Sequence, residues 1–202
     1  MKPNGTSPAK RRRIARTRVE IHPLTSDRWE DLVALFGEKG ACGGCWCMWW
    51  RLARSVFVKG KGAGNRRALR RIVDAGGVPG IVAYFDGTPA GWCSVAPRED
   101  FPVLSRSRVL APVDDSPVWS IVCFFVAKPF RRRGLTAALI EGAVAYAKKR
   151  SAAIVEGYPV EPKKDAMPDA FAYTGLASSF RRAGFAEVAR RSATRPVMRC
   201  YL

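Results

Sequence analysis

The sequence lacks the marks of several protein classes. No apolar run is long enough to span a bilayer, and no apolar stretch follows the basic N-terminal segment, so we expect no secretory signal. The dinucleotide-binding, P-loop, nucleophile-elbow and zinc-protease motifs are absent. The single histidine, His22, stands beside Pro23 at the end of a predicted strand, where a structural role fits better than a catalytic triad.

Acidic residues are scarce, with 17 Asp and Glu against 35 Lys and Arg, for a formal net charge of +18. Residues 1–18 contain no acidic residue and account for +7 of it through Lys2, Lys10, Arg11, Arg12, Arg13, Arg16 and Arg18. Their proline, glycine and serine content predicts a disordered basic tail over 1–18, followed by one folded domain over 19–202. The tail could contact nucleic acid or reflect a general arginine bias, and the remaining 18 − 7 = +11 would attract an anionic ligand.

Six cysteines without regular spacing indicate reduced thiols in a cytoplasmic protein rather than a disulfide framework. Cys42, Cys45 and Cys47 lie close together, which raises the question of a zinc site. Zinc prefers four ligands, and no second paired motif exists to complete the set. We therefore predict no metal.

Apolar periodicity and turn residues predict the secondary structure. The expected strands are 18–24, 80–85, 89–96, 118–127, 152–156, 186–192 and 197–201, and the expected helices are 25–36, 65–75, a helix from 135, and 174–183. The segments 37–64, 97–117 and 157–173 are expected to be irregular. This order predicts a single α/β domain with a mixed sheet and helices on both faces.

The stretch from Val118 to Arg150 carries most of the functional information. A buried strand ends before Pro129, three arginines and Gly134 follow, and Leu135 opens an amphipathic helix. The N–H groups of such a turn converge at the helix N-terminus, where the helix dipole favours negative charge. The sequence therefore predicts a pyrophosphate site at this turn.

The run from Arg131 to Thr136 resembles the R/Q-x-x-G-x-G/A signature of the GNAT superfamily of N-acetyltransferases, with Thr136 in place of the usual Gly or Ala. The segment from Phe180 to Phe185 resembles the family's Y-x-K-x-G-F element, and the likeness spans Val19 to Leu202. The resemblance implies a single-domain GNAT-like fold, with a mostly antiparallel twisted sheet whose fourth and fifth strands splay apart. It also implies acetyl-CoA as co-substrate and direct acetyl transfer to an amine.

Site residues follow from the same resemblance. The coenzyme would be held by Phe124, Phe125, Val126, Arg131, Arg132, Arg133, Gly134, Leu135, Thr136 and Ser179. Phe180 stands where the family commonly has a proton-donating tyrosine, so Tyr173 is the candidate acid, or else a packed aromatic residue. Ser179 bonding the sulfur and protonation by solvent are the alternatives. Glu156 is the candidate base, with a solvated strand-end charge and proton relay by water as alternatives.

The acceptor side is less defined. Trp46, Trp49 and Trp50 would either wall an acceptor pocket or close the core. We expect the acceptor to be the amine of an unidentified small molecule or peptide, and the chain to be a monomer or a homodimer with no membrane partner. Two other functions stay open: a coenzyme-A-binding module without catalysis, and nucleic-acid binding through the basic tail.

Overall fold

The computed structural model describes residues 18–162 and 169–202. The tail predicted over 1–18 lies outside these residues except for Arg18. No helix in the described part of the chain is long and apolar enough to cross a membrane.

The core of the fold is one seven-stranded sheet with the order β1-β2-β3-β4-β5-β7-β6. The strands are β1 (Val19–Pro23), β2 (Gly80–Phe85), β3 (Thr88–Pro97), β4 (Trp119–Val126), β5 (Ile154–Gly157), β6 (Ala186–Arg190) and β7 (Pro196–Tyr201). All neighbouring strands are antiparallel except β4 and β5, which are parallel. The mixed, mostly antiparallel sheet predicted from the sequence is confirmed.

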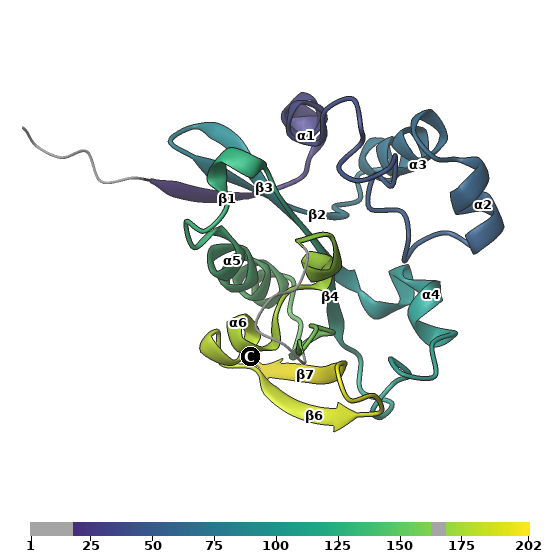
Figure 1. The fold of residues 1–202 in the computed structure, drawn as a ribbon, viewed down its shortest axis with the longest axis vertical. Helices are drawn as coiled ribbons and strands as arrows, with labels where there is room; N and C mark the ends of the chain where they lie inside the picture. Colours follow the sequence, from purple (N-terminus) through teal and green to yellow (C-terminus); the bar gives the residue numbers. More distant parts are fainter. Residues whose placement is uncertain (1–17, 163–168) are drawn as a thin grey trace, which may run out of the picture.

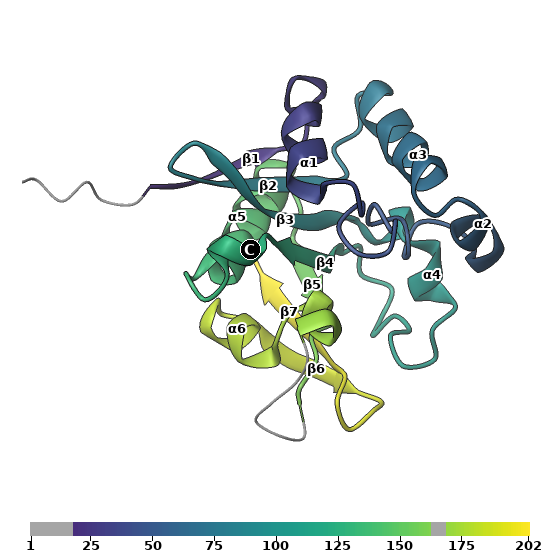
Figure 2. The same ribbon diagram turned by 45° about the horizontal axis from the view of Figure 1, so that its top comes forward.

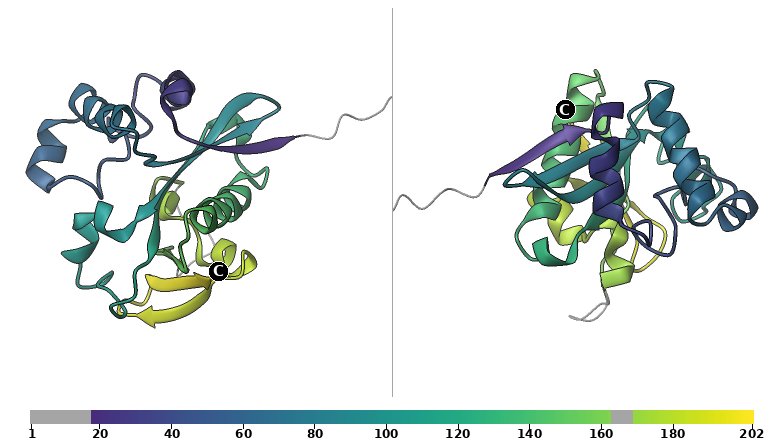
Figure 3. Two further views of the ribbon diagram at one scale, coloured as in Figure 1. Left: turned by 180° about the vertical axis from the view of Figure 1, so that it is seen from behind. Right: turned by 90° about the horizontal axis from the view of Figure 1, so that it is seen from above.

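Helices cover both faces of the sheet (Figures 1 and 3). The helices are α1 (Trp29–Phe36), α2 (Arg54–Lys59), α3 (Ala63–Asp74), α4 (Pro102–Ser105), α5 (Leu135–Lys149) and α6 (Ala177–Arg182). Successive side chains of β2 point to opposite faces of the sheet. Ile81 and Ala83 pack with α5 and α6 on one face, whereas Val82 packs with α1 and α3 on the other. Gly142 of α5 lets that helix approach β1, because an added Cβ there would lie 2.7 Å from Ile21 Cγ2.

The structure corrects the predictions for four helices. The helices α2 and α4 lie in segments predicted to be irregular, and both are short enough to depend on tertiary packing rather than on their own periodicity. The first helix begins at Trp29 after a single 3-10 turn, since the Thr25 side chain bonds Asp27 instead of capping the helix. The last helix begins at Ala177, because Gly175 at φ +82° separates it from a 3-10 turn.

The strands β4 and β5 pair over only three residues each, Trp119–Ile121 with Val155–Gly157. Beyond that point β4 continues to Val126, and β3 is its only strand partner among the described residues. The fully buried ring of Phe180 lies at the divergence, where it packs against Phe124 with a centroid distance of 6.1 Å. The predicted splay is confirmed, and it leaves one edge of β4 without a strand partner.

Candidate functional site

The turn between β4 and α5 has the backbone geometry that anion sites use. Gly134, the N-cap residue of α5, adopts the left-handed conformation (φ +79°, ψ 0°) and has no side chain with which to cap the helix, and the first turn contains no acidic residue. The N–H groups of Leu135 and Thr136 are therefore available to a ligand at the positive end of a 15-residue helix. This arrangement fits the pyrophosphate predicted for the turn.

Arginines surround this helix terminus. Arg131, Arg132 and Arg133 are all exposed. Arg131 donates from Nε to the Val126 carbonyl at 3.2 Å, which ties the turn to the end of β4. The guanidinium of Arg133 lies 5.2 Å from the centroid of the Phe85 ring, so an aromatic face holds it without neutralising its charge.

The open edge of β4 leads directly into this turn. The Ala127 N–H donates to the Ala90 carbonyl at 3.0 Å, so it points toward the β3 side. Because N–H groups alternate in direction along an antiparallel strand, those of Val126 and Phe124 point to the side that β5 leaves open. An extended ligand arm could bond there as an additional strand.

Glu156 lies on the opposite face of the sheet from α5 and is fully buried. Its Oε1 accepts hydrogen bonds from Arg98 at 2.9 Å and from the Tyr158 hydroxyl at 2.7 Å, and its Oε2 accepts one from Arg199 at 2.7 Å. The Tyr158 hydroxyl also contacts Ser120 at 2.8 Å. The alternative of a solvated strand-end charge is therefore wrong. The two arginine partners lie 58 and 43 residues away in sequence and were not anticipated.

This charged network also holds the long segment before β4. Arg199 makes two bonds to Asp114, and they lower the pKa of that carboxyl far below its usual range. Arg98 donates to the Leu110 carbonyl at 2.6 Å, and Arg191 donates to the Ala111 carbonyl at 2.7 Å. Glu156 thus occupies the centre of a network that orders the 98–118 segment.

Tyr173 and Ser179 lie in different surroundings. Tyr173 is half-buried on the α1 side of the sheet, and burial raises the pKa of its hydroxyl above the usual value, opposed by the charge of Arg195. Ser179 is buried in α6 and accepts a hydrogen bond from Arg182 at 3.2 Å. Within the described residues no hydrogen bond joins the two side chains. Because burial raises the pKa of Tyr173, its hydroxyl keeps its proton over a wide pH range.

The Acetyltransferase (GNAT) family model matches residues 46–163, more than half of the chain. The chain belongs to the GNAT acetyltransferase family. The match runs from Trp46 through β5, so it contains the turn and the open edge of β4, and it ends before Tyr173 and Ser179.

Solved structures share the GNAT fold at low sequence identity. The PaiA N-acetyltransferase of Thermoplasma acidophilum in complex with coenzyme A has 11% identity and a TM-score of 0.51, over 92% of this chain and 99% of its own. The aminoglycoside N-acetyltransferase AAC(6')-Iy in complex with CoA has 18% identity and a TM-score of 0.54, over 87% and 93%. A GNAT acetyltransferase of Listeria monocytogenes has 10% identity and a TM-score of 0.55, over 91% and 95%. No curated protein matches the chain in sequence.

Of the three tryptophans predicted to wall the GNAT acceptor pocket, Trp46 and Trp50 are buried, with 4% and 8% of their surface exposed. Trp46 stacks on Trp29 at 6.1 Å and packs in the core beneath α1 and α3. Trp50 lies in the cluster with Phe101, and its indole N–H has no hydrogen-bond partner in the described part of the chain. Trp49 is half-buried and contacts both clusters, so it is the best placed of the three to meet an acceptor.

All six cysteines are free thiols. The buried Cys47 Sγ lies 3.2 Å from Cys123 Sγ of β4 and accepts a hydrogen bond from the Trp92 indole at 3.0 Å. Hydrogen bonding with Cys123 and burial raise the pKa of the Cys47 thiol, which keeps it protonated. Among the described residues no three His, Cys, Asp or Glu side chains gather in a set that could hold a metal. The Cys47 contact was not foreseen, because 76 residues separate the two thiols.

Proposed function

We propose that this GNAT protein transfers an acetyl group from acetyl-CoA directly to the amine of a small molecule or peptide. The observation that carries the proposal is that the N-terminus of α5, which has no side-chain cap from Gly134, follows directly on the edge of β4 that lacks a strand partner. The pyrophosphate would bind the helix terminus and the pantetheine arm the strand edge. Because these two groups are joined in coenzyme A, the two binding features have to lie side by side. Family membership supports the same reaction class.

In this proposal the N–H groups of Leu135 and Thr136 bind the pyrophosphate, with the exposed arginines of the turn adding positive charge. The N–H groups of Phe124 and Val126 bond the pantetheine arm. When bound, acetyl-CoA supplies an already activated acyl group. The protein therefore accelerates transfer largely by holding the thioester and the amine in contact.

Two proton transfers remain to be assigned. Tyr173 is our candidate for returning a proton to the departing thiolate, since its raised pKa keeps the hydroxyl protonated. Both oxygens of Glu156 already accept hydrogen bonds from the chain's own groups, so we give Glu156 a positioning role and assign deprotonation of the amine to water. Ser179 is proposed to lie near the coenzyme sulfur.

One other function has an observation in its favour. Phe180 is fully buried and cannot donate a proton, which would suit a module that binds coenzyme A without catalysis. Calorimetric titration with acetyl-CoA, followed by turnover on a panel of amines, separates the two functions. Saturable binding with turnover supports the enzyme, binding without turnover on any amine supports the module, and absence of binding contradicts both. The cytoplasmic location and the choice between monomer and homodimer stay predictions.

A further inference from the structure

One continuous part of the folded domain contains positive charge only. Between Glu38 and Asp74 every charged residue is basic: Lys39, Arg51, Arg54, Lys59, Lys61, Arg66, Arg67, Arg70 and Arg71. This span, residues 39–73, contains α2 and nearly all of α3, and we call it the basic hairpin. It lies on the side of the molecule away from the start of α5 (Figures 1 and 2), so its charge is not explained by the coenzyme turn.

Most of this charge faces solvent. The side chains of Arg51 and Asp100 pair at 3.0 Å, and Arg51 is nearly buried. In contrast, the exposed members are Lys39, Arg54, Lys59, Lys61, Arg66, Arg67 and Arg71. The one ion pair of α3 joins Arg70 to Asp74, and in the described part of the chain no carboxylate pairs with Arg66, Arg67 or Arg71. A row of basic side chains whose charge is not neutralised by carboxylates attracts a polyanion.

Three of these guanidiniums lie over tryptophan rings. Arg54 lies 5.7 Å from the ring centroid of Trp49, Arg66 lies 5.4 Å from that of Trp46, and Arg70 lies 5.1 Å from that of Trp29. An aromatic face restrains an arginine without cancelling its charge, so less conformational entropy is lost when an anion binds.

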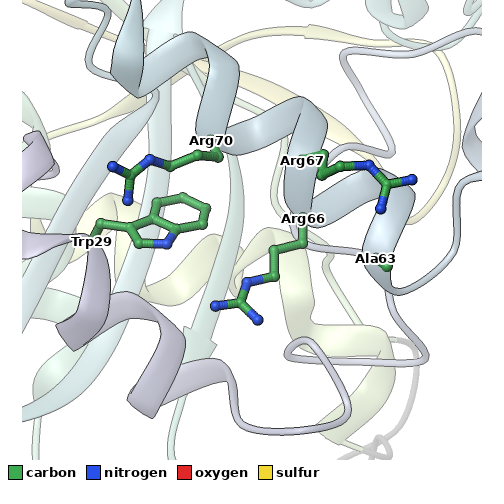
Figure 4. Close-up of a pocket in the computed structure, with 5 residues that line it drawn as sticks. All are labelled: Trp29, Ala63, Arg66, Arg67 and Arg70. Atoms are coloured by element: carbon green, nitrogen blue, oxygen red, sulfur yellow. The ribbon is translucent and has the colours of Figure 1, made fainter.

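The basic hairpin is also hollowed. A cavity of about 370 Å³ opens between α1 and α3, lined by Trp29, Ala63, Arg66, Arg67 and Arg70. Figure 4 shows Arg66 and Arg70 extending from α3 toward Trp29, whereas Arg67 points the other way along the outer side of the helix. The hairpin therefore presents guanidiniums both inside a groove and on the ridge beside it.

We propose that the basic hairpin binds the sugar–phosphate backbone of a double-stranded nucleic acid, without sequence preference. Arginine forks match phosphate oxygens, and backbone contacts provide most non-specific affinity. Of the aromatic rings in this span, Trp46, Trp50 and Phe57 are buried, with 4%, 8% and 5% of their surface exposed, and Trp49 is half-buried. The hairpin therefore offers little of the open stacking surface that single strands use. Its exposed large apolar residues are Val56 and Val58, which are too few to anchor it in a bilayer.

The test uses full-length protein and a fluorescein-labelled 24-base-pair DNA duplex of mixed sequence, with anisotropy measured at several salt concentrations. The variant is Arg67→Gln/Arg71→Gln, which removes two exposed charges that make no ion pair within the described residues. The control is Lys148→Gln/Lys149→Gln, which removes the same charge from the far end of α5.

We expect the arginine variant to bind the duplex about tenfold more weakly at moderate salt. A plot of log affinity against log salt has a negative slope, and each phosphate contact contributes about 0.9 to its steepness. The loss of two contacts should therefore make the slope of the variant shallower by about 1.8. The control should change neither quantity appreciably. Equal losses in both variants, or no duplex binding by the unaltered protein, would overturn the proposal. It is also overturned if the arginine variant loses binding only to vesicles containing phosphatidylserine. Acetyl-CoA titration of the same variants tests the proposed function separately, because the basic hairpin lies away from the turn before α5.

Discussion

The ring of Phe180 occupies the space that a side chain at Gly157 would need. A Cβ added at Gly157 would lie 2.2 Å from Phe180 Cε1 and 2.8 Å from its Cζ. Gly157 is also the last residue of β5 to pair with β4. The aromatic side chain that replaces the family's usual tyrosine thus packs at the point where the two strands separate.

We expect Gly157→Ala to destabilise the protein by about 1–3 kcal/mol, because the packed ring has to shift to admit the methyl group. Urea denaturation measures the change. Gly64→Ala is the matched control, since Gly64 lies in α3 with no atom near its added Cβ and a helical alanine is favoured over glycine. Equal losses from both substitutions would contradict the close packing of Phe180 against β5.

Gly134→Glu should weaken acetyl-CoA binding by about tenfold or more, because a carboxylate at the α5 N-terminus repels the pyrophosphate. Calorimetry with the full chain measures this affinity. Gly76→Glu is the control: Gly76 has the same φ of +79° and equally open surroundings, but lies beyond the end of α3. Similar affinity in the two variants would remove the turn from the coenzyme site.

Tyr173→Phe should lower kcat by about 100-fold with little change in KM, since only the proton donor is lost. The hydroxyl must be protonated to act, and its pKa is raised by burial, so the unaltered enzyme should retain activity into alkaline pH. Tyr201→Phe, at a tyrosine that is 65% exposed, serves as control. A kcat that is unchanged in Tyr173→Phe would assign thiolate protonation to solvent.

Glu156→Gln should cost about 3–5 kcal/mol of unfolding free energy, because it leaves the guanidiniums of Arg98 and Arg199 without their buried counter-charge. Turnover should fall along with stability, and the shape of the pH–rate profile should stay the same. A profile that loses its acidic limb in a variant of normal stability would instead identify Glu156 as the base.

The sequence by itself determined the parts that depend on neighbouring residues. The β4 strand, the turn with Gly134 and the start of α5 lie within one short stretch, and their backbone conformations follow from local sterics and apolar periodicity. The hairpin turn at Asp86–Gly87 is equally local, with both residues at positive φ. The conformation of the turn between β4 and α5 was predictable for the same reason.

Only the tertiary structure decided what surrounds the catalytic candidates. Glu156 meets Arg98 and Arg199 across 58 and 43 residues, and Cys47 meets Cys123 across 76. Such contacts depend on which faces of the sheet are buried together, and desolvation then decides whether a charge is paired or solvated. The short helix α2 formed for a related reason, since six residues gain too few hydrogen bonds to be helical without the packing of Phe57.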